Sequence, residues 1–168
     1  MKTNQEIRYD SIVSSPIGMI RIITNQSQLL ELRFEGEHID SFEQDMFFEN
    51  SSVLELHQLV KTQLQEYFEG TRKEFQFPYL MQGTAFQQEV YKALLKIPYG
   101  TTCSYQDIAI AIGNPKACRA VGMANHNNCL PILIPCHRVV GANKSLVGYA
   151  GGLGTKVKLL EIEGVRGF

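Results

Sequence analysis

The chain has 168 residues, of which 44% are hydrophobic and 20% are charged, and its formal net charge is −1 at pH 7. This length suits one ordinary domain or two small ones that share an interface, and the composition excludes a largely disordered chain. No apolar run approaches the roughly 20 residues of a membrane helix, and no apolar stretch follows the polar N-terminus, so we expect neither a membrane span nor a signal peptide. We therefore expect a cytoplasmic protein with reduced thiols.

Charged residues are distributed unevenly. Residues 1–82 contain seven Lys/Arg and thirteen Asp/Glu, whereas residues 83–168 contain nine and four. The C-terminal half is therefore the part expected to meet an anion, although chance surface composition would give a similar asymmetry. All the cysteines lie in this half, and we expect free thiols because none forms a Cys-x-x-Cys pair; they are Cys103, Cys118, Cys129 and Cys136.

The first half is predicted to be a strand meander with one helix. Apolar or β-branched runs at residues 7–13, 19–24 and 29–34 predict three strands, because turn-prone residues separate them. Residues 36–51 are polar and acidic, which is typical of a loop or a short helix. Apolar residues then recur at helical spacing up to Phe68, after Ser52 as the expected N-cap. This helix is expected to pack on the strands.

The second half is predicted to be mainly helical. Thr84 and Gln87 have the spacing of a capping box, so they begin a helix that is expected to end at Pro98. Ser104 is the expected N-cap of another helix, which reaches about Ile112.

A third helix is expected from Asn114, as its N-cap, to about residue 125, with Pro115 in its first helical position. Two short helices so close in sequence are typical of a helix-turn-helix. A glycine-rich loop at residues 148–154 precedes a final helix, expected over residues 155–163.

Cys136 is the candidate reactive residue. It follows a short, proline-rich apolar run at residues 130–135, which is expected to be a buried extended segment. A free thiol is mostly protonated at neutral pH, so a Cys nucleophile needs a base, and His137 oriented by a carboxylate would serve. Neighbouring side chains of an extended segment point to opposite faces, so contact between Cys136 and His137 would require a bridging water or a turned backbone. Glu163, at the end of the last helix, is the carboxylate that we expect to orient His137.

Two other interpretations of these residues stay open. Cys136 and His137 would also suit an ordinary buried cysteine and a core histidine. With His126 and Cys129 they form a His-x2-Cys-x6-Cys-His set of zinc-ligand types, although this spacing matches no common zinc finger.

The second helix of the predicted helix-turn-helix has small side chains and one long one, Arg119. Small residues let a helix approach DNA closely, even in the minor groove, and an Arg can then enter the base stack. The same face would also suit packing against another helix. The small residues are Ala117, Cys118, Ala120, Val121, Gly122 and Ala124.

The sequence closely resembles the O6-alkylguanine-DNA alkyltransferases, also called methylated-DNA–protein-cysteine methyltransferases. The resemblance covers nearly all of residues 84–164, and it is carried by Ile-Pro-Cys-His-Arg-Val at 134–139, Arg-Ala-Val-Gly at 119–122 and Gly-Tyr-Ala-Gly-Gly-Leu at 148–153. It implies an α+β fold. A small ribonuclease-H-like N-terminal unit of strands and one helix, residues 1–82, would precede a helical unit for DNA binding and alkyl transfer, residues 83–168.

The resemblance also implies direct-reversal DNA repair. The alkyl group of O6-alkylguanine would pass irreversibly to Cys136, with O4-alkylthymine as a second substrate left open. Each molecule would act once, without cofactor or metal, because the lesion is itself the alkyl donor. The implied partner is double-stranded DNA with alkylated bases, bound through the minor groove with the damaged base flipped out. We expect a monomer that is nucleoid-associated if the organism is prokaryotic.

Residue roles follow from the resemblance position by position. A Glu163–His137–water–Cys136 relay would generate the thiolate, and Arg119 would fill the space left by the flipped base. The implied catalytic set is Cys136, His137, Glu163, Tyr105, Asn128 and Lys156. The implied DNA-binding set is Arg119, Ala120, Gly122, Tyr105 and Ala117, and the implied base pocket is Tyr149, Ala150, Val139 and Pro131.

Two alternatives to repair are retained. A non-repairing sensor of alkylated DNA would bind the lesion without reacting, although such relatives replace the cysteine that is present here. A Cys-His-Glu hydrolase would use the same nucleophile but would turn over and would need an oxyanion hole, for which no motif is visible.

Overall fold

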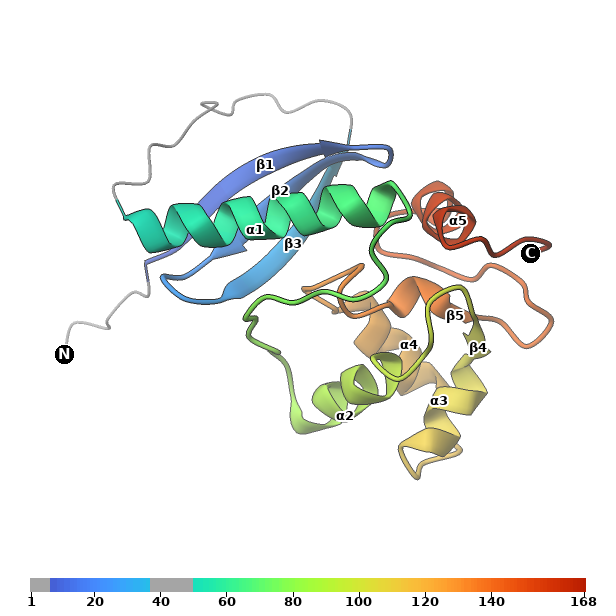
Figure 1. The fold of residues 1–168 in the computed structure, drawn as a ribbon. Helices are drawn as coiled ribbons and strands as arrows, with labels where there is room; N and C mark the ends of the chain where they lie inside the picture. The colour runs from blue at the N-terminus through green and yellow to red at the C-terminus, as the bar shows by residue number, and fades with distance from the viewer. Residues whose placement is uncertain (1–6, 37–49) are drawn as a thin grey trace. The chain divides into compact units, whose positions relative to one another are not determined.

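The computed structural model describes residues 7–36 and 50–168. The chain forms two compact units, residues 1–80 and 81–168 (Figure 1). The loop or short helix expected over residues 36–51 falls mostly outside the described residues. Within the described residues, no helix is both long and apolar enough to cross a membrane.

A three-stranded antiparallel sheet forms one layer of the first unit (Figure 1). Its strands are β1 (Tyr9–Ser15), β2 (Gly18–Thr24) and β3 (Leu29–Gly36), in that spatial order, so the predicted meander is confirmed with small shifts at the strand ends. The β1–β2 hairpin turns at Gly18, whose φ is +102° and where an added Cβ would lie 2.8 Å from the Gly36 oxygen. Only glycine fits such a position.

Helix α1 (Ser51–Phe68) contacts β1 and β2 through its apolar face. The predicted helix is confirmed, but its N-cap is Asn50 and not Ser52, because the Asn50 Oδ1 accepts a hydrogen bond from the Ser52 backbone N–H at 3.1 Å. The buried residues repeat every three or four positions, as the hydrophobic spacing predicts; they include Val53, Leu56, Val60, Leu64 and Tyr67.

A buried histidine connects α1 to the sheet. The two ring nitrogens of His57 lie 2.7 Å from Ser11 Oγ and 3.0 Å from Thr24 Oγ1. Burial, and to a smaller extent the positive charge of Lys61, lower the pKa of His57 to about 4. The ring is therefore neutral in the folded protein at pH 7.

Acid is expected to destabilise the protein through His57. The unfolded chain binds a proton on this ring near pH 6.5 and the folded chain only near pH 4, so stability is complete above pH 6.5 and falls towards pH 4. The expected loss in the free energy of unfolding is about 2–3 kcal/mol. Urea unfolding followed by circular dichroism would measure this loss. His57→Gln should flatten this pH dependence and the exposed-site control His126→Gln should retain it. Equal slopes of stability against pH in the unmodified protein and in both variants would contradict the prediction.

The second unit contains a cluster of three helices. α2 (Ala85–Leu94), α3 (Tyr105–Ala111) and α4 (Cys118–His126) pack on one another. Capping boxes begin α2, from Thr84 to Gln87, and α3, from Ser104 to Asp107, so both predicted helix starts are confirmed. α2 ends before the predicted position, in 3₁₀-type turns ahead of Pro98.

The predicted start of α4 is wrong. The Ala117 N–H donates to the Asn114 oxygen at 3.0 Å, which closes a turn over residues 114–117. The first helical hydrogen bond of α4 runs from Val121 to Ala117, and no side chain caps the helix. Asn followed by Pro suits the first two positions of a β-turn as well as a helix start, and here the turn forms.

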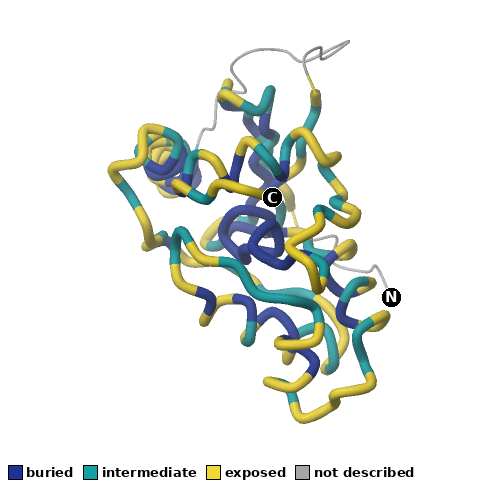
Figure 2. The backbone as a smooth tube through the Cα atoms, turned by 90° about the vertical axis from the view of Figure 1, so that its right-hand side faces the viewer, coloured by how far each residue is buried: buried dark blue, intermediate teal, exposed yellow. Residues whose placement is uncertain are grey.

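Residues 130–140 are buried throughout, a continuous dark-blue stretch of chain in Figure 2. The predicted burial is confirmed, but the predicted extended conformation is wrong. The Ile134 N–H donates to the Leu130 oxygen at 2.8 Å, Ile132 has a φ of +74°, and Cys136 begins a 3₁₀ turn, η1 (Cys136–Arg138). The two prolines of this run have no N–H for a strand ladder, which favours turns.

Two further elements hold η1. β5 (Val139–Val140) pairs in parallel with β4 (Cys103–Ser104). The last helix, α5 (Leu153–Ile162), contacts η1 and begins two residues before the predicted start. Together they place Cys136 between a strand pair and a helix.

Candidate active site

Cys136 has a buried side chain that is held by Asn128. The residue is 5% exposed, and its Sγ accepts a hydrogen bond from Asn128 Nδ2 at 3.2 Å. The same amide donates to the Ile134 oxygen and accepts from the Leu130 N–H, so it braces both sides of the turn before the cysteine. Asn128 therefore fixes the position of the sulfur.

The thiol of Cys136 is protonated in the resting protein. Burial raises its pKa, and the Asn128 hydrogen bond, the Lys156 ammonium and the Tyr149 hydroxyl lower it only in part. A buried thiol is a poor nucleophile until a base removes its proton. The site therefore needs a base beside the cysteine.

His137 and Glu163 form a buried pair that suits this need. The His137 Nε2 lies 2.7 Å from the Glu163 Oε1, and both side chains are fully buried. Burial lowers the pKa of His137, while hydrogen bonds from His137 and Arg138 hold the pKa of Glu163 at about 2 despite burial. A carboxylate has no proton to donate, so Nε2 carries the ring hydrogen and Nδ1 is the basic nitrogen of a neutral imidazole.

Arg138 holds the carboxylate, a role that the sequence interpretation missed. Its Nε and Nη2 donate to the two oxygens of Glu163 at 2.8 and 3.0 Å, and its Nη1 donates to the Ile97 oxygen. The Gly100 N–H also donates to Glu163 at 3.1 Å. The signal available in the sequence was an Arg directly after His137 in an apolar run, where a buried charge needs a partner.

Lys156 lies on α5 and is completely buried. Its Nζ donates to the Val139 oxygen at 2.6 Å and to the Val147 oxygen at 3.2 Å. Burial lowers its pKa, and Cys136 opposes this shift. The ammonium therefore links the cysteine segment to the loop before α5.

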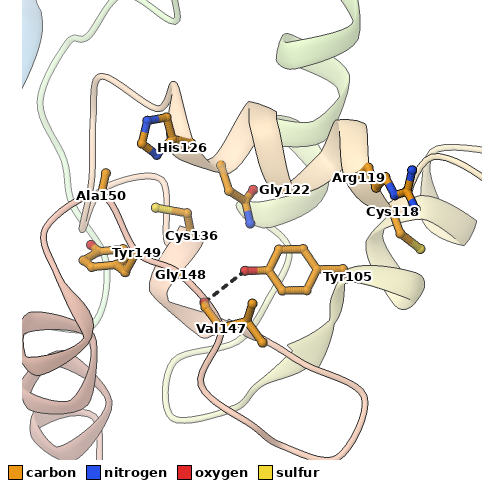
Figure 3. A pocket seen from close by; sticks show the side chains of 11 residues that line it. Tyr105, Cys118, Arg119, Gly122, His126, Cys136, Val147, Gly148, Tyr149 and Ala150 are labelled. Atoms are coloured by element: carbon orange, nitrogen blue, oxygen red, sulfur yellow. Dashed lines mark hydrogen bonds between the residues drawn. The ribbon is translucent and has the colours of Figure 1, made fainter.

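A cavity of about 590 Å³ opens beside Cys136 (Figure 3). Its walls include five other residues of the expected catalytic, DNA-binding and base-pocket sets, namely Tyr105, Arg119, Gly122, Tyr149 and Ala150, and five residues outside those sets, namely Cys118, Asn125, His126, Val147 and Gly148. The Tyr105 hydroxyl donates to the Val147 oxygen at 3.4 Å, so α3 and the loop meet across the cavity.

Two expected base-pocket residues do not line this cavity. Val139 is buried in β5, where its backbone oxygen accepts from Lys156, while Pro131 is buried in the turn before the cysteine. Two expected DNA-binding residues also lie outside its walls. Ala120 is exposed on α4 and Ala117 is the half-buried N-cap of that helix.

The zinc interpretation finds no support in the described part of the chain, where no three His, Cys, Asp or Glu side chains gather as metal ligands. Cys129 is exposed, whereas His137 is buried against Glu163. The candidate ligands therefore lie in different environments.

Known proteins match both units. Residues 7–80 match the 6-O-methylguanine DNA methyltransferase ribonuclease-like domain, and residues 85–165 match the 6-O-methylguanine DNA methyltransferase DNA-binding domain. The constitutive methylated-DNA–protein-cysteine methyltransferase of Bacillus subtilis is 44% identical over 161 residues, 94% of this chain and 96% of that protein. The methylated-DNA–protein-cysteine methyltransferase of Methanosarcina acetivorans is 44% identical over 156 residues, 93% of this chain and 98% of that protein.

Solved structures agree with this similarity. The crystal structure of Mycobacterium tuberculosis OGT in complex with DNA is 42% identical with a TM-score of 0.78, and the match covers 90% of each chain. The crystal structure of Mycobacterium tuberculosis O6-methylguanine methyltransferase is 39% identical with a TM-score of 0.76, over 94% of this chain and 93% of that one. The α+β fold expected from the sequence is thus confirmed, and the chain belongs to the methylated-DNA–protein-cysteine methyltransferase family.

Proposed function

We propose that this protein repairs DNA by moving the alkyl group of O6-alkylguanine to Cys136 in a single, irreversible event. The observation that carries the proposal is a buried thiol in the wall of a cavity, beside a histidine–carboxylate pair. The cavity volume is within the roughly 300–1,000 Å³ of small-molecule sites, so a flipped base has room.

The proposed step is an in-line displacement at the alkyl carbon. His137 takes the proton of Cys136 through a bridging water, and the Sγ–C bond forms as the O6–C bond breaks. The electron pair of the broken bond stays on the guanine, which receives the proton at N1 and leaves as an ordinary base. The thioether has no route back to a thiol, so each molecule acts once and no cofactor takes part.

The arrangement around the cavity suits DNA with an alkylated base. We assign minor-groove binding to the helix-turn-helix of α3 and α4, because α4 exposes Arg119 beside small residues. Tyr105 and the loop at Tyr149 would enclose the flipped base. A monomer in the cytoplasm, associated with the nucleoid in a prokaryote, would meet this substrate.

Intact-protein and peptide mass spectrometry after mixing with DNA that contains O6-methylguanine tests the proposal. One methyl group on the Cys136 peptide, saturating at one per protein, is expected. Cys136→Ser should gain none, and the exposed-site control Cys129→Ser should give an unchanged yield. Binding without methylation would favour the sensor alternative, and repair beyond one lesion per protein would favour a turnover enzyme.

Arg119→Ala is expected to slow repair of duplex lesions by about tenfold or more, since the Arg would hold the space left by the flipped base. Reaction with free O6-benzylguanine should stay within about twofold of the unmodified protein, because no base stack has to be opened. Single-turnover rates on both substrates, with the exposed-site control Lys116→Ala, measure the difference. Equal losses on both substrates would remove Arg119 from this role.

A further inference from the structure

Asn125 is a buried polar residue in the wall of the cavity. It belongs to α4, is 9% exposed, and lines the same cavity as Cys136. Among the residues that the structure describes, neither its Nδ2 nor its Oδ1 has a hydrogen-bond partner. Unpaired buried polar groups are costly and rare in folded proteins, so an amide with two of them points to a function.

A short chain of contacts connects Asn125 to the sulfur. Its backbone oxygen accepts from the Asn128 N–H at 3.3 Å, and Asn128 Nδ2 donates to Cys136 Sγ at 3.2 Å. The next residue, His126, also lines the cavity and lies toward its Cys136 end in Figure 3, away from Arg119. Asn125 therefore belongs to the part of the wall nearest the group to be transferred, because the alkyl carbon has to approach Sγ to about 3–3.5 Å.

The chemistry of the amide limits the group that would pair with it. Asn125 offers one donor group and one acceptor atom, and both lack partners in the described structure. A methyl or propyl group can satisfy neither, and a carboxylate can only accept. A hydroxyl donates and accepts at once, so it is complementary to the amide.

We propose that Asn125 is a specificity-determining residue for the transferred group, and that its amide binds the hydroxyl of an O6-(2-hydroxyethyl) lesion. The inference rests on the proposed function, since it names a lesion class for the same cavity. The transfer step is unchanged. Sγ attacks the CH₂ carbon bonded to O6, the O6–C bond breaks with its electron pair on the guanine, and the thiol proton goes to the guanine N1 by way of His137.

The test compares lesions of nearly equal size. Single-turnover rates are measured on one duplex sequence with O6-(2-hydroxyethyl)guanine, O6-propylguanine or O6-methylguanine, for the unmodified protein, Asn125→Leu and the exposed-site control Asn127→Leu. Leu is close to Asn in size and leaves no unpaired amide, so the variant should fold. The hydroxyethyl-to-propyl rate ratio should fall about tenfold in Asn125→Leu and stay within about twofold in Asn127→Leu.

The outcomes separate this inference from the proposed function. Methyl transfer that proceeds in all three proteins, with the same hydroxyethyl-to-propyl ratio in each, would overturn the role of Asn125 and leave alkyl transfer intact. Absence of methyl transfer in the unmodified protein would instead refute the proposed function. A ratio that falls in Asn125→Leu but is retained in Asn125→Asp, whose carboxylate can still accept from the lesion hydroxyl, would support hydrogen bonding over cavity size.

Discussion

Glu163→Gln is expected to slow alkyl transfer by about 10²- to 10⁴-fold, the range associated with loss of general-base catalysis. The carboxylate keeps the ring hydrogen of His137 on Nε2, at 2.7 Å, and favours the imidazolium that forms when the ring takes the thiol proton. A glutamine amide can donate as well as accept, so it no longer imposes that tautomer and no longer stabilises the cation. Single-turnover transfer from O6-methylguanine DNA measures the loss, with the exposed Glu161→Gln as control.

The same substitution is expected to destabilise the fold by about 3–5 kcal/mol, because it leaves the buried guanidinium of Arg138 without its carboxylate. Adding Arg138→Met removes the uncompensated charge, so the double variant should recover much of the stability while its transfer rate stays low. Urea unfolding of the single and double variants supplies the comparison. A double variant that also regains its transfer rate would show that Glu163 acts only through folding.

Lys156→Met is expected to slow transfer at pH 7 by about 10- to 100-fold. The ammonium lowers the pKa of Cys136 against the effect of burial, so its removal raises the pKa of the thiol. A higher thiol pKa means less thiolate at neutral pH, and the rise of the rate with pH should move to more alkaline values. The substitution also removes the donor shared by the Val139 and Val147 oxygens, which should loosen the loop.

A pH–rate profile from about pH 6.5 to 9.5 distinguishes the two effects of Lys156. Loss of charge stabilisation gives a variant that is slowest relative to the unmodified protein at neutral pH and partly recovers in alkali. Loss of loop support alone gives a constant deficit at every pH, which would contradict the electrostatic role. Lys158→Met, an exposed site on the same helix, should leave the profile in place.

The roles of three buried residues in the site are interdependent; these residues are Glu163, His137 and Arg138. Arg138 keeps Glu163 ionised, and Glu163 in turn orients His137. Each has its polar atoms buried, so removal of one leaves another unsatisfied in a medium where charge is costly. We therefore expect the effects of single substitutions here to be strongly non-additive.

The amino-acid sequence by itself determined the features that depend on near neighbours. Capping boxes at Thr84 and Ser104 satisfy backbone N–H groups three residues away. Apolar and β-branched runs predict the strands, and apolar residues three or four positions apart define the buried face of α1. The Pro-Cys-His-Arg run likewise identified Cys136 as the candidate nucleophile. None of these inferences needs contacts between distant parts of the chain.

Only the tertiary structure decided what depends on distant partners. Arg138 finds its acceptors in Ile97 and Glu163, 41 and 25 positions away, so sequence spacing could not assign it a role. The start of α4 and the turn at residues 130–135 were ambiguous because the same Asn, Pro and apolar residues suit more than one local conformation, and packing chooses between them. That the Asn125 amide has no partner among the described residues is visible only when its neighbours are in place, because a missing hydrogen bond is a property of the folded surroundings and not of the residue.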